Sequence, residues 1–232
     1  MTSRILALTI DARDPALLAR FWSSLLGEDP GFVLRFQQID VPKQGLNQAH
    51  FDTTTTSLEH QRQVVEQALE LGGHHLDVGQ TGDEGHVVLG DPEDNEFCVI
   101  EPDNRFLEGT ARIGALSSDG GPEVGYFWSA ALGWPLVWDQ DEETAIQSPD
   151  GGPKITWGGA PEEPKVGKNR LHLDLRAEGD LDAEVERLVA LGATHADIGQ
   201  GDVAWVVLAD PGGNEFCVYP TETGRAPLAD SP

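Results

Sequence analysis

The beginning of the chain shows a strand-like pattern followed by a helix-like pattern. Residues 5–11 alternate between apolar and polar side chains, which predicts a strand. Apolar residues then recur at helical spacing, so we expect a helix that Asp14-Pro15 opens, that runs to Leu26 and that Gly27 ends. The residues expected on its buried face are Leu18, Phe21, Trp22 and Leu25.

The same order of patterns then returns. Residues 48–54 predict a strand, and residues 57–71 predict a helix that Gly72-Gly73 ends. Residues 86–90 and 96–100 predict two further strands joined by a tight turn. The side chains expected to point inward from the second helix are Leu58, Val65, Ala68 and Leu69.

A sequence repeat divides the chain into two copies. Residues 87–99 return as residues 206–218, at an offset of 119. Earlier landmarks return as well: Phe21-Trp22 as Phe127-Trp128, His50-Phe51-Asp52 as His172-Leu173-Asp174, and Leu71-Gly72 as Leu191-Gly192. We therefore predict two homologous domains, 1–103 and 111–220, with a linker at 104–110 and a disordered tail at 221–232.

The two copies differ in length at one place. Between Gly27 and His50 lie 23 steps, whereas 39 steps separate the equivalent Gly133 and His172, so the first copy is 16 residues shorter there. In the second copy this stretch predicts three strands, 135–139, 144–147 and 154–157. The first copy keeps one, 32–39. Its sheet should lack about a hairpin.

Composition excludes several classes of partner. Forty acidic against fifteen basic residues give a net charge of -25, which repels nucleic acid and anionic membranes alike. No apolar run reaches the roughly 18 residues of a membrane span, and the first residues lack a secretory signal, so we expect a soluble, cytoplasmic protein. Cys98 and Cys217 occupy equivalent places in the two copies, which favours reduced thiols over a disulfide.

Three motifs resemble those of a known family. They are Asp14-Pro15 with Leu18 to Trp22, Asn169 to Leu175, and Trp205 to Cys217. Together they resemble the glyoxalase-like and bleomycin-resistance proteins of the vicinal oxygen chelate superfamily. The resemblance implies an α+β fold of paired βαβββ units that curl into a partly open barrel around a small-molecule site. The superfamily includes lyases, isomerases, dioxygenases, thiol transferases and antibiotic-binding proteins, and fold alone does not choose among them.

The resemblance also implies where a metal would be bound. Metal-dependent members use His or Gln on the first strand, His on the strand that opens the second unit, and Glu on the last strand. The first position falls on Ala7 and on Arg112 or Ile113, the second on His50 and His172, and the third on Cys98 and Cys217. Because only the histidines match, we expect no metal and no other cofactor.

Other interpretations of these residues stay open at this point. Asp52 and Asp174 lie two residues after each histidine, hence on the same strand face, and with His and Cys would give a mixed zinc site. The cysteines otherwise serve as small apolar fillers, or as nucleophiles if a histidine lowers the thiol pKa.

We expect the ligand site mainly in the second copy. Candidate catalytic residues are His172, Asp174 and Cys217. The histidine and the aspartate would act as acid and base, or alternatively form a hydrogen-bonded pair with a purely structural role. Strand alternation places Glu215 on the same face as Cys217. Trp205 and Trp157, near strand ends, are expected to form an aromatic wall of the site, with core packing as the alternative for each. The equivalent ligand-binding residues of the first copy are His50, Asp52 and Cys98.

Three functions are compatible with this pattern. The first is binding of a small metabolite or antibiotic in a metal-free cavity, mainly of the second copy. The second is a lyase or isomerase with little or no dependence on metal, acting on a small carbonyl compound; the third is a structural tandem without activity. The sequence does not decide whether the chain is an enzyme. The short sheet of the first copy leaves an edge, which the sister copy or a second chain in a homodimer would cover.

Overall fold

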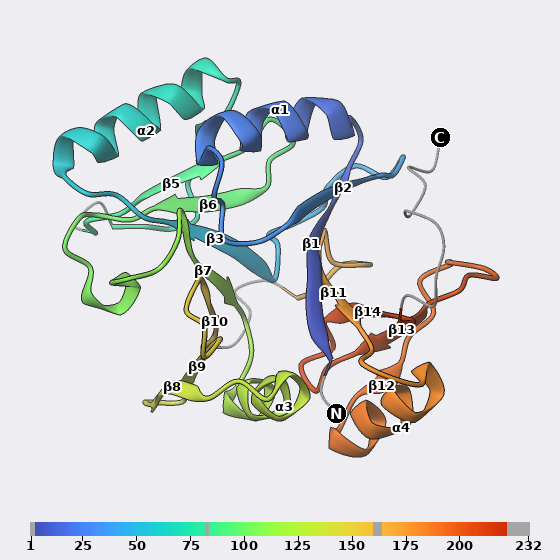
Figure 1. Ribbon diagram of the computed structural model, residues 1–232. Helices are drawn as coiled ribbons and strands as arrows, with labels where there is room; N and C mark the ends of the chain where they lie inside the picture. Colours follow the sequence, from blue (N-terminus) through green and yellow to red (C-terminus); the bar gives the residue numbers. More distant parts are fainter. Residues whose placement is uncertain (1–2, 82–83, 160–163, 222–232) are drawn as a thin grey trace.

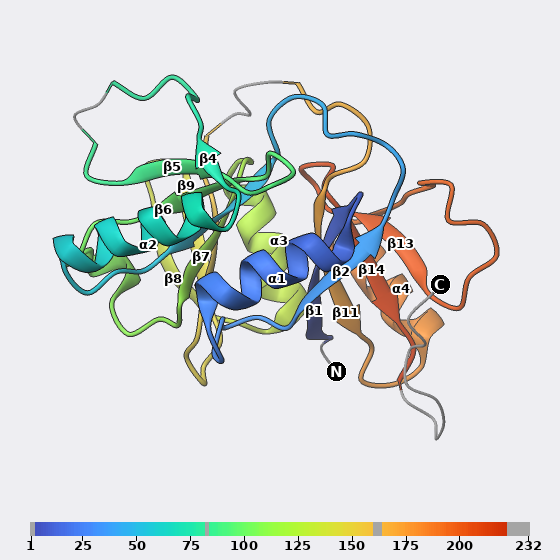
Figure 2. The same cartoon turned by 90° about the horizontal axis from the view of Figure 1, so that it is seen from above.

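Two sheets with helices packed on their outer faces make up the molecule (Figure 1). The computed structural model describes residues 3–81, 84–159 and 164–221, so the expected tail lies, except for Thr221, outside the described residues. The described helices pair as neighbours, α1 with α2 and α3 with α4, as Figures 1 and 2 show. Their bounds are α1 Pro15–Leu26, α2 Leu58–Glu70, α3 Pro122–Leu132 and α4 Leu181–Leu191, with a short 3-10 turn at Arg105–Leu107. None of these helices combines the length and apolar character needed to cross a membrane.

The strands follow the predicted order in both repeats. In the first repeat they are β1 Arg4–Ala12, β2 Leu34–Gln38, β3 Ala49–Thr53, β4 His74–His75, β5 Val87–Gly90 and β6 Glu96–Val99. In the second they are β7 Ile113–Ser118, β8 Leu136–Gln140, β9 Glu143–Gln147, β10 Lys154–Trp157, β11 Leu171–Arg176, β12 Thr194–His195, β13 Val206–Ala209 and β14 Glu215–Tyr219.

Each sheet combines strands of both repeats. The six-stranded sheet has the order β12-β13-β14-β11-β1-β2, and the eight-stranded sheet has the order β4-β5-β6-β3-β7-β10-β9-β8. The junctions are antiparallel pairs, β1 with β11 and β3 with β7. Each repeat therefore shares both of its sheets with the other repeat rather than forming a barrel of its own. The boundaries at 103 and 111 describe the repeats in the sequence rather than separate sheets.

The predicted loss of a hairpin from the first repeat is confirmed. In the second repeat, β10 pairs with β9 and β9 with β8. In the first repeat β2 occupies the position of β10 and is the last described strand of its sheet. This sheet therefore lacks counterparts of β9 and β8.

The helix faces were predicted correctly for α1 but only in part for α2. All four expected residues of α1 are buried. In α2, Leu58 is 60% and Leu69 37% exposed, so both were wrong, and Val64 takes the inward place instead. Leu58 is the first residue of the helix, before the turn that contacts the sheet, and Leu69 lies about 100° around the helix from the buried Ala68, outside the buried face.

A buried carboxylate ties the last turn of each repeat to its first helix. Asp91 accepts hydrogen bonds from the backbone nitrogens of Glu93 and Asn95 and, at 3.1 Å, from the indole nitrogen of Trp22. In the second repeat Asp210 accepts from Trp128 at 2.9 Å. The Asp-Pro-x-x-Asn motif thus fixes the strand turn against the core tryptophan.

Replacing this carboxylate should destabilise the fold strongly. In Asp91→Ala the indole of Trp22 and two turn nitrogens lose their acceptor, and each unsatisfied buried group costs about 1–3 kcal/mol. We expect the free energy of unfolding in urea to fall by about 3–5 kcal/mol. Asp182→Ala, at an exposed position of α4, is the control and should change it by less than about 0.5 kcal/mol. A loss below about 1 kcal/mol in Asp91→Ala would contradict this role.

Candidate functional site

Neighbouring strands bring the three candidate catalytic residues of the second repeat together. Asp174 on β11 lies directly beside Cys217 on β14, because the two strands pair in parallel in this register. His172 is two residues before Asp174 and faces the same side of the sheet. One ligand atom from each of the three lies within 4.8 Å of the others, and all three residues are buried. The structure thus brings these three residues together.

The first repeat supplies the partners of Asp174. The hydroxyl of Thr9, on β1, donates to Asp174 Oδ2 at 2.7 Å, and Arg35, on β2, donates to the same oxygen at 3.3 Å. Among the described residues, the second oxygen, Oδ1, has no hydrogen-bond partner, and His172 Nε2 lies 3.5 Å from it. The site is therefore built by both repeats, through the β1-β11 junction.

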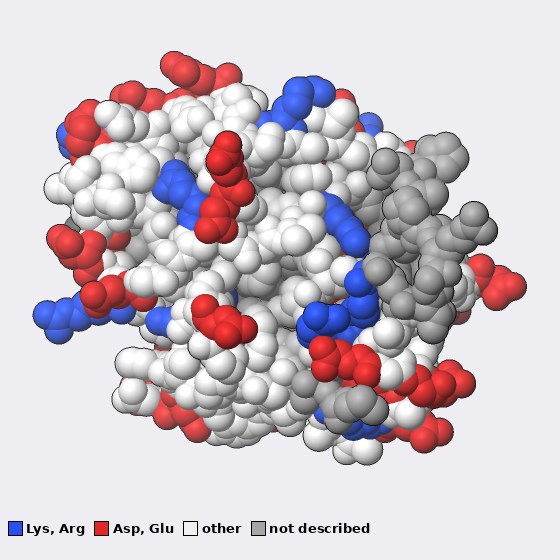
Figure 3. Space-filling view, viewed as in Figure 1, with Lys and Arg blue, Asp and Glu red and all other residues white. Residues whose placement is uncertain are grey.

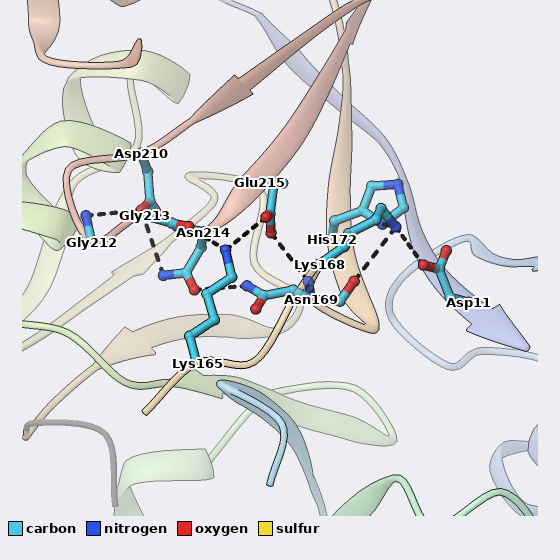
Figure 4. Close-up of polar contacts among 10 residues, drawn as sticks. All are labelled: Asp11, Lys165, Lys168, Asn169, His172, Asp210, Gly212, Gly213, Asn214 and Glu215. Atoms are coloured by element: carbon cyan, nitrogen blue, oxygen red, sulfur yellow. Dashed lines mark hydrogen bonds and ion pairs between the residues drawn. The ribbon is translucent and has the colours of Figure 1, made fainter. Parts of the chain in front are cut away.

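Lys168 connects this cluster to a second buried acid. Its ammonium group lies 2.5 Å from Asp11 Oδ2 and 3.4 Å from His172 Nδ1 (Figure 4). An ammonium group has no lone pair, so Nδ1 must accept and the proton of the neutral imidazole must be on Nε2. This tautomer directs the Nε2 proton toward Asp174 Oδ1.

Burial governs the protonation of the cluster. It lowers the pKa of His172 well below 6.5, with a further contribution from the Lys168 charge. Burial likewise raises the pKa of Asp174 above its usual value, although Thr9 and Arg35 oppose the shift. It raises the pKa of Cys217 to about 12, and the Asp174 charge adds to this. At neutral pH the histidine is neutral and Cys217 is a thiol, not a nucleophilic thiolate.

Two cavities meet at Lys168. One, of about 280 Å³, reaches His172, Cys217 and Trp205. The other, of about 400 Å³, is lined by Lys165, Arg170 and the loop before β3. Both are lined by Asp11, Ile39, Lys168 and Ile198, so they are contiguous. Together they have the size of a small-molecule site.

The aromatic wall includes Trp205 but not Trp157. Trp205 is partly exposed and stacks on Tyr219, with ring centroids 5.3 Å apart, at the smaller cavity. Trp157 is 2% exposed and stacks on Trp128 in the core. It meets His172 only at a cavity of about 40 Å³, which is too small for an organic ligand.

Glu215 belongs to a brace that occurs in both repeats. It lies 2.7 Å from Lys165 Nζ and accepts from the backbone nitrogen of Asn169 (Figure 4). In the first repeat, Glu96 accepts from Lys43 and from the Asn47 backbone in the same way. Because the same contacts hold both loops, Glu215 fixes the loop that carries Lys168 rather than facing the ligand with Cys217.

The corresponding cluster of the first repeat is more open and lacks the two cations. His50, Asp52 and Cys98 converge on the eight-stranded sheet, where the hydroxyl of Ser117, on β7, donates to Asp52 Oδ2 at 2.5 Å. The His50 side chain is 38% exposed against 3% for His172. Burial, together with Asp52, raises the pKa of the Cys98 thiol. In this cluster Leu46 stands in the place of Lys168 and Thr156 in that of Arg35.

Sequence reasoning missed the residues that come from other strands. Thr9 and Ser117 lie opposite His172 and His50 across the antiparallel junctions. The expected first-strand position in the second repeat, Arg112 or Ile113, is wrong, because the register of β7 places Ser117 there. Arg112 instead donates to the Thr54 carbonyl. The one signal available was Lys168, a cation four residues before the histidine and without a counterpart in the first repeat.

Comparison with known proteins agrees with the fold. The model of the glyoxalase-like domain matches residues 7–100 and 116–219. The chain belongs to the glyoxalase-like domain family. Maize glyoxalase I has 13% identity to this family member, with a TM-score of 0.64 over 94% of this chain and 92% of the maize chain.

A second solved structure gives the same result. A Bacillus subtilis protein provisionally named a dioxygenase has 15% identity and a TM-score of 0.57 over 96% of this chain and 86% of its own. At these identities the likeness concerns the fold alone. No curated protein matches the chain.

The second-repeat cluster does not fit the metal that the glyoxalase-like resemblance implies. His172 Nε2 carries a proton in the tautomer that Lys168 imposes, so this atom has no lone pair free for a metal. Two cations, Lys168 and Arg35, already compensate the acids, and the first strand offers a threonine hydroxyl. The opposing observation is Asp174 Oδ1, a carboxylate oxygen without a hydrogen-bond partner among the described residues, which favours a cation.

We expect purified protein to contain no stoichiometric divalent metal. Elemental analysis after chelator-free purification should find far less than one equivalent of zinc, iron, manganese or nickel per chain. One equivalent that His172→Ala removes would contradict the argument above. One equivalent that only His50→Ala removes would place the metal in the first repeat instead.

The pH dependence of stability should report the neutral state of His172. Its folded pKa lies below 6.5, so the unfolded chain binds a proton that the folded chain does not, and stability falls as pH drops below about 6.5. The expected loss is on the order of 1.4 kcal/mol per pH unit. His172→Gln should lack this loss in urea unfolding from pH 7.5 to 5, whereas His50→Gln, at the exposed histidine, should keep the wild-type slope. Equal slopes in all three proteins would show that His172 protonates freely.

Proposed function

We propose that the chain binds a small organic molecule bearing an anionic group, in the two contiguous cavities around Lys168, without metal and without converting it. The observation that carries this proposal is the position of the Lys168 ammonium group, between Asp11 and His172 where both cavities meet. Lys165 and Arg170 line the larger cavity as well. With Lys168 they give this cavity three cations against one acid, Asp11, and in a chain of net charge -25 this local excess of positive charge favours an anionic ligand over a cationic one.

The apolar and the hydrogen-bonding parts of the lining suit one amphipathic ligand. Trp205, stacked on Tyr219, offers an aromatic surface at the smaller cavity. Asp11 is 2% exposed, and its Oδ1 has no hydrogen-bond partner among the described residues. A ligand hydroxyl or amine would satisfy this oxygen, while the anionic group contacts Lys168. Specific pockets combine a mainly apolar wall with a few such polar groups.

Both repeats contribute to the proposed site, though unequally. The second repeat supplies His172, Cys217 and Trp205, and the first supplies Asp11 from β1 and Gln37 from β2. The open cluster around His50 lies outside these two cavities. We therefore propose one ligand site per chain, with the first repeat as part of its wall.

A second candidate function is metal-independent proton transfer on a small carbonyl compound, as in a lyase or isomerase. It is favoured by the pair His172 and Asp174, in which a carboxyl of raised pKa lies 3.5 Å from a neutral imidazole. Such a pair combines a group that can donate a proton with one that can accept it. Binding remains the first proposal because Asp174 itself lines neither large cavity.

Ligand-induced stabilisation tests the binding proposal. The probes are a panel of small aromatic and aliphatic carboxylates and any compound that native mass spectrometry finds on the purified protein. A bound probe at about 100 times its Kd should stabilise the fold by about 2.7 kcal/mol, visible as a rise in Tm. The double variant Asp11→Asn/Lys168→Met, which keeps the local charge balanced, should lose the shift, and so should Trp205→Ala.

The first repeat provides the controls. His50→Ala, at the first-repeat equivalent of His172, should keep the shift. His86→Ala, at the first-repeat equivalent of Trp205, should keep it as well. If they abolish it while the second-repeat variants leave it intact, the site is assigned to the wrong place. A probe recovered chemically unchanged after long incubation supports binding, whereas turnover that is lost in His172→Ala supports the lyase or isomerase.

A further inference from the structure

The six-stranded sheet ends in a strand edge that the described chain does not cover. β2 pairs with β1 on one side and with no described strand on the other. The Val33 carbonyl and the Ile39 nitrogen face the β1 side. Because backbone groups alternate in direction along a strand, those of Leu34, Phe36 and Gln38 face outward. An edge of this kind is a template for another strand.

The second repeat shows what normally lies at this edge. There β9 pairs with β10 and buries Ala145 and Ile146, and it packs against α3. The approach is close: a Cβ added to Gly125 on α3 would collide with Thr144. In the first repeat the corresponding space between α1 and β2 is an open groove of about 580 Å³.

The groove is apolar. The side chains that line it include Trp22, Leu26, Phe32, Leu34 and Phe36. At its margin Val33 is 64% exposed, the largest exposed fraction among the large apolar residues described. An exposed apolar surface beside an open strand edge is typical of a protein contact.

The residues that line this groove include no Asp or Glu, and the nearest acids along the chain are Glu28 and Asp29, in the exposed loop between α1 and β2. Residues 15–27 and 30–39 contain none of the chain's 40 Asp and Glu, and their charged residues are Arg20 and Arg35. Figure 3 shows the surface over α1 mainly white with some blue, and red side chains beside it. Two chains of charge -25 repel each other wherever acidic surfaces meet, so they can approach closely at a surface of this kind.

We propose that two copies of the chain form a dimer by pairing their β2 strands antiparallel about a twofold axis. In this pairing, the outward backbone N–H and C=O groups of Leu34, Phe36 and Gln38 in one copy form hydrogen bonds with those of the other copy. The exposed Val33 of each copy becomes buried at the contact, and the two six-stranded sheets join into one. The same contact holds in place the strand that carries Arg35, the partner of Asp174.

Mass measurement with a matched pair of variants tests this dimer. Analytical ultracentrifugation of the full chain should give twice the chain mass of 25.0 kDa at micromolar concentration. Val33→Glu places two extra acidic groups at the contact and should weaken dimerisation about 100-fold or more. Val189→Glu, at an exposed valine of α4, is the control and should remain dimeric. Circular dichroism melting checks that both variants fold.

Hydrogen exchange locates the contact independently. The backbone amides of residues 32–39 should exchange more slowly at high than at low protein concentration, and the difference should vanish in Val33→Glu. A monomer at all concentrations overturns the proposal and leaves the edge to another segment or another protein. A dimer that Val33→Glu leaves intact, or one without concentration-dependent protection of residues 32–39, overturns it too.

Discussion

The antiparallel pairing of β1 with β11 is the interaction on which the site depends. It places Thr9 opposite His172 and brings β2, with Arg35, within reach of Asp174. Neither repeat alone contains the buried cluster: the second supplies the histidine, aspartate and cysteine, and the first supplies the groups that bind the aspartate. A change that loosens this junction should therefore affect the site even if it touches no cavity residue.

The two clusters have the same three residues but different chemistry, and two positions explain this. Lys168 and Arg35 make the second cluster buried and charge-compensated, whereas Leu46 and Thr156 leave the first cluster without cations and its histidine partly exposed. A repeated sequence motif thus predicts that the same residues meet twice, but not that they act alike. Of the neighbours that differ, Arg35 and Thr156 lie on strands from the other repeat, whereas Lys168 and Leu46 lie in the loop before the histidine strand of the same repeat.

This limit also explains how much the sequence could predict. Local patterns predicted the helices, nearly all strands and the missing hairpin, because periodicity, caps and turns act over a few residues. The meeting of His172, Asp174 and Cys217 followed from strand alternation and the repeat. The exchange of strands between repeats, and with it Thr9, Arg35 and Ser117, could not be predicted, because either pairing of the units buries the same apolar faces. Leu58 and Leu69 were misassigned because helical periodicity does not say where along the helix the sheet contact ends.

Fold stability alone does not account for the charges buried at the second cluster. Replacing a buried ion pair by apolar residues of similar volume is often neutral or stabilising, because desolvation of the charges offsets their attraction. Asp11 and Asp174 are buried, and each has one oxygen without a hydrogen-bond partner among the described residues, beside cations that are only partly exposed to water. The first cluster folds into the same sheet geometry with leucine and threonine in place of the two cations. Since the fold tolerates these simpler residues in the first cluster, the charges of the second cluster support the proposal of a ligand that contacts them.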